Sequence, residues 1–385
     1  MSHLALLTTS FPNGQPGIEA AGSFVADFAA ELAQRLKITV VAPGNETDQK
    51  TQGPFTVHRF AVPQLPLSLL KPSNPAHWGN IIRTLYAGQK ATERLVRTKD
   101  IDHILALWVL PSGYWARRAW KHHGIPYSVW ALGSDIWTLS TLPIVKNVLQ
   151  VVLRDSDNCF ADGYLLKQDV ECLSEHTCEF LPSVRKLPLR GAKAVATRPP
   201  FRLAFLGRWH PHKGVDLLVE ALKLLDESDW HKIKEVRIAG GGPLETLVKS
   251  GCATLRAVGR PVTVRGYLDK AQAAELLFWA DYLVLPSRIE SIPVIFSDAM
   301  QAGCPLIATP VGDLPRLLNE YDVGILSAET SSHSLAAAIR SGINGSPNAF
   351  SAGLRRALKQ FSVERACDQL VRTLNIVERL AVSAP

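Results

Sequence analysis

Short apolar runs alternate along the chain with stretches whose apolar residues recur at helical spacing. The run LALLTTS at 4–10 precedes an amphipathic segment at 22–36, and the apolar run ITVVAP follows at 38–43. The same alternation continues through the apolar runs at 103–109 and 126–133. Strands and helices in this order form a parallel sheet that helices cover on both faces. We therefore predict a doubly wound α/β domain in the first half of the chain.

The alternation restarts in the second half at RLAFLGR, residues 202–208. Before it lies a segment rich in proline, glycine and basic residues, 187–200, which we interpret as the linker between two domains. The second half thus predicts another doubly wound domain. Its periodicities predict helices at 214–225, 270–280 and 293–302 and strands at 235–241, 262–267, 282–287 and 305–310.

A chain of 385 residues is too long for one ordinary hydrophobic core and indicates two or three domains. The fold class that we predict is α/β, with two Rossmann-like doubly wound domains that face each other across a cleft. Residues 1–190 would form the first domain and 191–362 the second, and a C-terminal helix at about 363–385 would pack back on the first. Ligands of such sheets bind beyond the carboxyl ends of the strands, where we expect the site.

Composition narrows the class of protein. Hydrophobic residues make up 46% and charged residues 20% of the chain, as in globular proteins. The longest apolar runs, such as 104–111, are shorter than the roughly 18 residues of a membrane helix, and no signal peptide is recognisable. Six cysteines without a C-x-x-C pair favour reduced thiols in a cytoplasmic protein. The net charge of +7 comes without a long basic block, so nucleic-acid binding is not expected.

Two cations stand in the short loop that follows the strand predicted at 202–208. Arg208 and Lys213 are five apart in GRWHPHKG, directly after an apolar run that ends at Gly207. Unpaired N–H groups and the dipole at the start of the next helix favour an anion by ~0.3–1 kcal/mol. A guanidinium fork and a mobile ammonium together suit a diphosphate. The alternative is a solvated loop whose charges are incidental.

A pair of carboxylates eight residues apart marks the stretch 286–310. Glu290 precedes the predicted helix, Pro293 fits its first turn, and Asp298 lies inside it. A carboxylate accepts two hydrogen bonds from adjacent hydroxyls, so the pair suits a sugar or a ribose. The alternative for Asp298 is a solvated side chain.

Asp135 ends the sequence Gly-Ser-Asp that follows a predicted strand at the expected edge of the cleft. Its carboxylate could bind hydroxyl groups of a ligand. It could equally cap the helix that follows.

Other polar patterns do not indicate a site. The D-x-D sequences at 100–102 and 155–157 precede apolar runs, and we interpret them as polar flanks at the amino ends of strands rather than metal ligands. His210 and His212 have no further ligands at metal spacing, so no metal is expected. The absence of G-x-G-x-x-G, Walker A and G-x-S-x-G motifs argues against a dehydrogenase, a P-loop ATPase and an α/β-hydrolase.

Taken together, these stretches resemble the family-4 glycosyltransferases, which are retaining enzymes with the GT-B fold. The family motif G-R-x-x-x-x-K-G is similar to residues 207–214. Its two glutamates followed by A-M-x-x-G-x-P are similar to 290–305, except that Asp298 replaces the second glutamate. The resemblance covers most of the chain and is stronger in the second domain. Further similar segments are GGGPLE at 240–245, RGYL at 265–268, ADYLVLPS at 280–287, WVLPSG at 108–113 and GSDIW at 133–137.

The resemblance implies roles for individual residues. Arg208 and Lys213 would hold the donor diphosphate, Glu290 would contact hydroxyls of the donor sugar, and Asp298 would contact the ribose. With Asp135, the first three of these are the catalytic candidates. The other donor-binding candidates are Gly207, the backbone N–H groups of Ile292, Val294 and Ile295, Tyr267 and Leu268 near the base, and the glycine loop near Gly14, Gly17 and Gly22.

Two positions depart from the family pattern. The family commonly has histidine before G-S-D, in contact with the transferred sugar, where this chain has Leu132. Leucine neither donates a hydrogen bond nor stabilises developing charge, which bears on sugar identity and on catalysis. Asp298 is one methylene shorter than glutamate, so a ribose contact would need a small helix shift or a bridging water.

The implied function is a retaining hexosyltransferase that moves a sugar from a UDP- or GDP-linked donor to a sugar or lipid-linked acceptor. We expect it in polysaccharide, lipopolysaccharide or glycolipid synthesis, in the cytoplasm, with neither a cofactor nor a metal. Two other hypotheses stay open. One is a catalytically silent GT-B protein that binds a nucleotide sugar or a partner enzyme, which Leu132 motivates. The other is a GT-B epimerase that acts on the nucleotide sugar itself.

The segment 80–99 is basic and amphipathic. Such a helix can rest on anionic lipid, which would hold the protein at the inner face of the plasma membrane. The alternative is a solvated helix face. The charges concerned are Arg83, Lys90, Arg94, Arg97 and Lys99 against Glu93.

Overall fold

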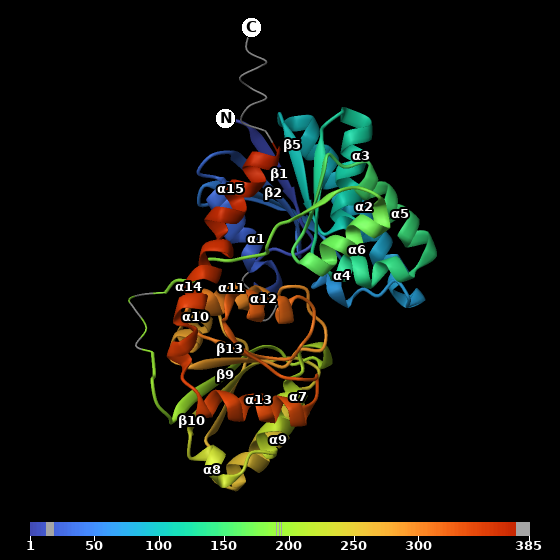
Figure 1. The fold of residues 1–385 in the computed structure, drawn as a ribbon. Coiled ribbons are helices and arrows are strands. Elements are labelled where there is room, and N and C mark those ends of the chain that lie inside the picture. The colour runs from blue at the N-terminus through green and yellow to red at the C-terminus, as the bar shows by residue number, and fades with distance from the viewer. Residues whose placement is uncertain (13–18, 190, 192, 194, 375–385) are drawn as a thin grey trace. The chain divides into compact units, whose positions relative to one another are not determined.

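The structure is a computed structural model that describes residues 1–12, 19–189, 191, 193 and 195–374 (Figure 1). Two compact units divide the chain between them. The first contains Met1–Ser183 and Val363–Pro385, and the second contains Val184–Ser362. The division comes after Ser183, ahead of the boundary expected at residue 190, because residues 185–187 are hydrogen-bonded to a helix of the second unit.

The first unit contains one sheet in the order β3-β4-β2-β1-β5-β6-β7-β8. Every neighbouring pair is parallel except β3 with β4. All side chains of β1, β5 and β6 are buried, as in a sheet covered on both faces. The strands are β1 (His3–Leu7), β2 (Lys37–Gly44), β3 (Asp48–Gln52), β4 (Phe55–Ala61), β5 (His103–Leu107), β6 (Tyr127–Ala131), β7 (Asn158–Ala161) and β8 (Cys178–Phe180).

Helices of the first unit connect these strands, and one further helix of this unit, α15, comes from the C-terminal part of the chain. In Figure 1, α15 in red lies beside α1 in blue, where the Cys367 thiol donates to the Phe28 carbonyl and Arg35 pairs with Asp368. The helices are α1 (Glu19–Leu32), α2 (Trp78–Thr98), α3 (Tyr114–His123), α4 (Ser134–Trp137), α5 (Pro143–Arg154), α6 (Tyr164–Ser174) and α15 (Val363–Leu374), with short turns η1 (Leu67–Leu69), η2 (Pro75–His77), η3 (Val109–Gly113) and η4 (Leu139–Thr141).

The second unit contains a fully parallel sheet in the order β11-β10-β9-β12-β13-β14. Its strands are β9 (Phe201–Arg208), β10 (Ile233–Gly241), β11 (Val262–Arg265), β12 (Tyr282–Leu285), β13 (Leu306–Ala308) and β14 (Gly324–Leu326). Its helices are α7 (Val215–Lys223), α8 (Glu227–Trp230), α9 (Glu245–Ala257), α10 (Lys270–Trp279), α11 (Val294–Gln301), α12 (Leu314–Tyr321), α13 (Ser332–Asn344) and α14 (Ser351–Gln360), with short turns η5 (Pro211–Lys213) and η6 (Pro347–Phe350).

The strand order of the second unit creates a point where the chain changes direction across the sheet. From β9 the chain moves outward to β10 and β11, and it then returns to the other side of β9 with β12. The loops that follow β9 and β12, residues 209–214 and 286–293, therefore leave adjacent strands toward opposite edges of the sheet. Ligands of doubly wound folds bind at this switch point, beyond the carboxyl ends of the strands. Every strand and helix predicted for this unit is present, with shifted ends: for example, β12 ends at Leu285 rather than at residue 287.

The sequence pattern did not indicate the antiparallel strand β3. Its residues DQKTQ are polar and almost wholly exposed, so they show no apolar alternation. The strand exists because its backbone pairs with β4 at the edge of the sheet. Elsewhere in the described residues, the six cysteines are free, and no helix is both long and apolar enough to cross a bilayer.

Candidate functional site

The loops after β9 and β12 are packed tightly against each other at the switch point. Gly214 has φ +65°, and a Cβ built on it would lie 1.7 Å from the Pro286 carbonyl oxygen, so only glycine fits. Arg288 ties the loops from the other side: its backbone N–H donates to the His212 carbonyl at 2.7 Å. Its guanidinium binds the carboxylate of Asp216 through two hydrogen bonds of 2.9 and 2.6 Å. The loop that contains Lys213 is therefore held in a defined position, whereas Arg208, which we expected in the same loop, is the last residue of β9.

Lys213, Glu290 and Ser287 form a polar cluster where these loops meet. The Lys213 ammonium lies 2.6 Å from a carboxylate oxygen of Glu290, and the Ser287 hydroxyl donates to the same oxygen at 2.8 Å. The Glu290 side chain is only 9% exposed, whereas that of Lys213 is 36% exposed. The Ser287 carbonyl accepts a 2.5 Å hydrogen bond from the hydroxyl of Thr309, the residue that follows β13. The cluster thus has a buried, fixed carboxylate and a cation that solvent can reach.

Arg208 is the last residue of β9 and is exposed. Within the described part of the chain, no carboxylate lies at ion-pair distance from its guanidinium, which can therefore take an external anion. The next residue, Trp209, is buried, and its backbone N–H donates to the Gly241 carbonyl at 2.8 Å. Gly207 lies within β9, opposite Gly240 of β10. The buried tryptophan fixes the backbone from which Arg208 projects.

The start of α11 leaves backbone donors beside this cluster. Pro293 is the N-cap and makes no capping hydrogen bond through its side chain. The N–H groups of Val294 and Ile295 lie in the first turn, where a helix offers no internal acceptor and its dipole is positive. Ile292 is buried just before the cap. The arrangement suits an anionic group at the carboxyl edge of the sheet.

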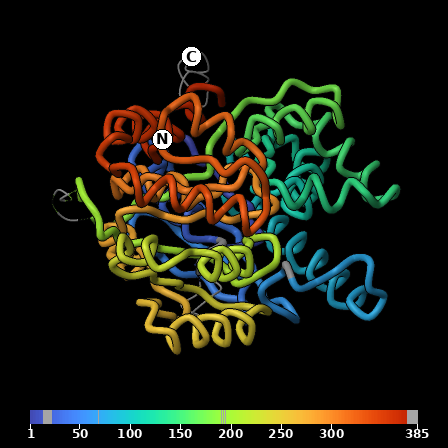
Figure 2. Tube along the Cα trace, turned by 60° about the horizontal axis from the view of Figure 1, so that its bottom comes forward, coloured from blue at the N-terminus to red at the C-terminus, as the bar shows by residue number. Residues whose placement is uncertain are grey.

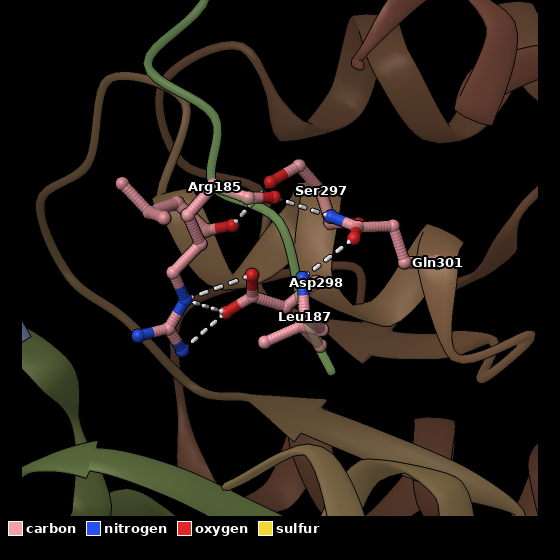
Figure 3. A network of polar contacts seen from close by, with 6 residues as sticks. Arg185, Leu187, Ser297, Asp298 and Gln301 are labelled. Atoms are coloured by element: carbon pink, nitrogen blue, oxygen red, sulfur yellow. Dashed lines mark hydrogen bonds and ion pairs between the residues drawn. The ribbon is translucent and has the colours of Figure 1, made fainter. Parts of the chain in front are cut away.

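Asp298, on α11, is held by an arginine that the sequence analysis did not identify (Figure 3). The Arg185 Nε lies 2.9 and 2.8 Å from the two carboxylate oxygens, and its Nη2 lies 2.5 Å from one of them. The Gln301 amide donates to the Arg185 carbonyl and accepts from the Leu187 N–H. Asp298 is fully buried, so the alternative of a solvated side chain is wrong. A ribose at this carboxylate would share it with Arg185 or displace the guanidinium.

Tyr267 and Leu268 follow β11, near the carboxyl end of the adjacent strand β10. The Tyr267 ring lies against Gly241, where a Cβ would come within 2.6 Å of its Cε2 atom. Tyr267 as a whole is 42% exposed despite this contact. An exposed aromatic face at this edge is suited to stacking on a planar ligand group.

In the first unit, Asp135 binds backbone groups. One carboxylate oxygen accepts from the Val109 N–H at 2.6 Å and the other from the Leu132 N–H at 3.2 Å. Burial raises the pKa of Asp135 to about 6, although these donors oppose the shift. The carboxylate therefore joins the loops after β5 and β6. It does not cap α4, because Asp135 lies inside that helix and the N-cap Gly133 has no side-chain capping hydrogen bond.

Gly22 lies within α1, where a Cβ would come 2.7 Å from the Phe11 backbone. Its role in the structure is to let the helix approach the segment after β1. Gly14 and Gly17 lie outside the described residues. The D-x-D carboxylates also have structural partners: Asp102 accepts from the His3 N–H, and Asp155 pairs with Arg117. No cluster of three or more His, Cys, Asp or Glu suited to a metal occurs among the described residues.

The structure therefore brings together Lys213, Glu290 and the start of α11, with Arg208 at the end of the adjacent strand. Asp135 and Gly22 belong to the other unit. Sequence reasoning missed Ser287, Arg288 and Arg185. Ser287 and Arg288 stand inside the stretch 286–310, so their polar side chains next to Glu290 could have indicated the site. Arg185 lies 113 positions from its partner Asp298, and nothing in the local sequence indicates the contact.

The second unit contains the segment that matches a known protein family. Residues 200–344 match the family Glycosyl transferases group 1. The chain is 29% identical over 189 residues to a D-inositol 3-phosphate glycosyltransferase of Jonesia denitrificans, covering 47% of this chain and 44% of that protein. It is 32% identical over 149 residues to a glycogen synthase of Mycobacterium tuberculosis, covering 38% and 35%. The aligned part spans less than half the length of these relatives.

Solved structures match over the whole length. A sucrose-phosphate synthase from Thermosynechococcus elongatus covers 100% of both chains with a TM-score of 0.75 and 16% identity. Anabaena HepE in complex with UDP covers 97% of this chain and 100% of its own with a TM-score of 0.69 and 17% identity. Such low identities establish the fold alone. Residues 200–344 thus match the glycosyl transferases of group 1, and the two doubly wound units of the chain have the GT-B fold of these solved structures.

Proposed function

We propose that this chain is a retaining glycosyltransferase of family 4 that moves a sugar from a nucleotide-sugar donor to an acceptor hydroxyl. The observation that carries the proposal is the cluster of Lys213, Glu290 and Ser287 at the switch point of the second sheet. It combines a fixed carboxylate for sugar hydroxyls with a solvent-accessible cation for a phosphate. Relatives of this segment carry sugar-transfer names, which supports the same class of reaction.

The donor diphosphate would lie between Arg208, Lys213 and the first turn of α11. Two cations and two backbone N–H groups then face the oxygens that gain charge as the bond to the sugar breaks. Donors placed on a leaving group act mainly in the transition state, and each 1.36 kcal/mol that they supply there is about tenfold in rate. On binding, the phosphate would compete with Glu290 for Lys213 and free the carboxylate for hydroxyls of the sugar.

In the proposed step, the bond that breaks and the bond that forms lie on the same face of the sugar. The bond from the anomeric carbon to the phosphate oxygen breaks, and the acceptor oxygen bonds to the same carbon from the same side. The acceptor proton passes to the departing phosphate oxygen, so no separate protein base is required. The charges on Arg208, Lys213 and α11 neutralise the leaving group without a metal. Retention of configuration follows from this front-face geometry.

UDP is the first donor nucleotide to test, because structural neighbours were solved with UDP and with UDP-glucose. GDP-linked sugars are tested alongside the UDP-linked ones. The Tyr267 ring beside Gly241 would stack on the base. The acceptor would be a sugar or a lipid-linked sugar, in keeping with polysaccharide, lipopolysaccharide or glycolipid synthesis.

The experiment incubates the purified chain with UDP- and GDP-sugars and a panel of sugar acceptors, and it identifies products by mass and by the anomeric coupling in NMR spectra. A glycoside with the donor's anomeric configuration supports the proposal. An inverted product would contradict the mechanism, and an isomerised donor would indicate an epimerase. Binding of a nucleotide sugar without any product would favour a catalytically silent protein.

A further inference from the structure

The first unit exposes an aromatic and aliphatic stripe along α2, on the outer side of the helix. Trp78, Ile82 and Tyr86 follow one another at intervals of four residues and are 55%, 65% and 69% exposed. Residues spaced in this way lie one above another on a helix. The buried residues of α2 are Thr84, Gly88, Thr92 and Leu95, on another side of the helix. Single exposed apolar residues are ordinary, but a contiguous stripe of large ones indicates a contact surface.

Trp78 is held in place although its ring is exposed. Its indole N–H donates to the Pro72 carbonyl at 2.8 Å, which fastens the preceding segment to the start of the helix. The Lys71 N–H donates to His77 at 2.9 Å and supports the same turn. The ring therefore presents its apolar face to solvent while its polar group is satisfied within the chain. In Figure 2 this part of the chain lies in the blue range of the coloured trace.

Cations lie on the next strip of the same exposed side. At about 100° per residue, Arg83, Lys90 and Arg94 are displaced from the Ile82–Tyr86 line by less than half a turn and away from the buried side. All three are exposed, and no carboxylate within the described residues is at ion-pair distance from them. The single acidic residue of α2, Glu93, is hydrogen-bonded to His123 at 2.8 Å and lies 3.8 Å from the cation of Arg97. The stripe is therefore bordered by positive charge that the protein itself leaves uncompensated.

We propose that this face of α2 docks on an anionic lipid bilayer, with Trp78, Ile82 and Tyr86 in the interfacial region and Arg83, Lys90 and Arg94 against lipid headgroups. A helix that lies in the interface buries one apolar strip and places cations beside it, which is the arrangement found here. Aromatic side chains with one satisfied polar group favour that depth. The inference uses residues of the first unit only and holds whether or not the proposed sugar transfer is correct.

The test is flotation of the full chain with vesicles of neutral lipid, or of neutral lipid with about one third anionic lipid, at low and at high salt. Binding is expected to anionic vesicles at low salt and to weaken at high salt, because salt screens the headgroup attraction. The variant R83Q/K90Q/R94Q and the variant W78S/I82S/Y86S should each lower the partition coefficient about tenfold or more. If the wild-type chain fails to float with anionic vesicles at low salt, the proposal is overturned.

Two matched controls keep the result specific. K234Q/K249Q/R256Q removes the same three charges from exposed positions of the second unit, and L224S/L247S/V258S removes three exposed apolar side chains there. Both should float like the wild type, and circular dichroism should show that all variants are folded. Equal losses in the controls would overturn the assignment to α2. Dextran sulfate, a soluble polyanion, tests whether charge alone explains binding. If W78S/I82S/Y86S binds both dextran sulfate and anionic vesicles as well as the wild type does, the surface is a general polyanion site and the proposal is overturned.

Discussion

The guanidinium of Arg185 binds the carboxylate of Asp298 with three N···O distances between 2.5 and 2.9 Å, although the two residues are 113 positions apart. The carboxylate is fully buried, and the arginine side chain is 12% exposed. The pair, with Gln301, anchors the segment that leads into the second unit onto α11. The residue that the sequence suggests as a ribose ligand is therefore also a structural anchor.

Breaking this pair on one side should destabilise the second unit. Arg185→Ala leaves a buried carboxylate without its cation, for which about 3–5 kcal/mol is typical. Asp298→Asn should cost less, because it removes the charge as well as the ion pair. Chemical denaturation of both single variants and of the double variant R185A/D298N measures the coupling energy. Strictly additive losses would show that the pair contributes no interaction of its own.

Lys213→Ala should abolish more than nine tenths of turnover and most of the thermal stabilisation by nucleoside diphosphates, since it removes the mobile charge from the phosphate position. A ligand at 100 times its dissociation constant adds ~2.7 kcal/mol of stability, which makes the loss measurable. The matched control is Lys223→Ala, an exposed lysine of α7 that pairs with Glu220 at 2.8 Å. Retention of more than about a tenth of turnover by the Lys213 variant would refute the role given to this lysine.

Gly214→Ala should lower both stability and nucleotide binding, because a Cβ would stand 1.7 Å from the Pro286 carbonyl oxygen and push the two loops of the site apart. Gly259→Ala is the matched control: its φ is +77°, close to the +65° of Gly214, but nothing lies within 4 Å of its Cβ position. The control isolates the cost of the backbone angle, about 1 kcal/mol. Thermal unfolding with and without UDP compares the two, and equal losses would mean that loop contact is unimportant.

Asp135 should make stability depend on pH in a way that Asp135→Asn does not. Burial raises the pKa of Asp135 from 3.8 to about 6, so the folded state binds its proton at higher pH than the unfolded state does. The resulting stabilisation is complete below about pH 4 and is lost as the pH rises through about 6. Relative to Asp135→Asn, the wild type should gain about 2 kcal/mol between pH 7 and pH 4. Urea unfolding at both values tests this, and a constant difference would contradict the raised pKa.

Local pattern was sufficient to predict the two doubly wound units, because each buried strand and each amphipathic helix carries its own period in the sequence. The same reasoning placed Lys213 and Glu290 at the carboxyl edge of one sheet, since strand order and loop position follow from the alternation of elements. It failed at β3, whose polar residues form a strand only because β4 offers backbone partners.

Only the tertiary structure decided which polar groups are already in use. From the sequence, Asp135 and Asp298 could each bind a ligand or have another role. In the structure, the carboxylate of Asp135 accepts hydrogen bonds from backbone N–H groups, and that of Asp298 pairs with Arg185. It likewise turned a basic amphipathic segment into an exposed stripe with Trp78 at its start. Hydrogen-bond partners and exposure depend on residues far away in the chain, so they arise from packing and have no local signature.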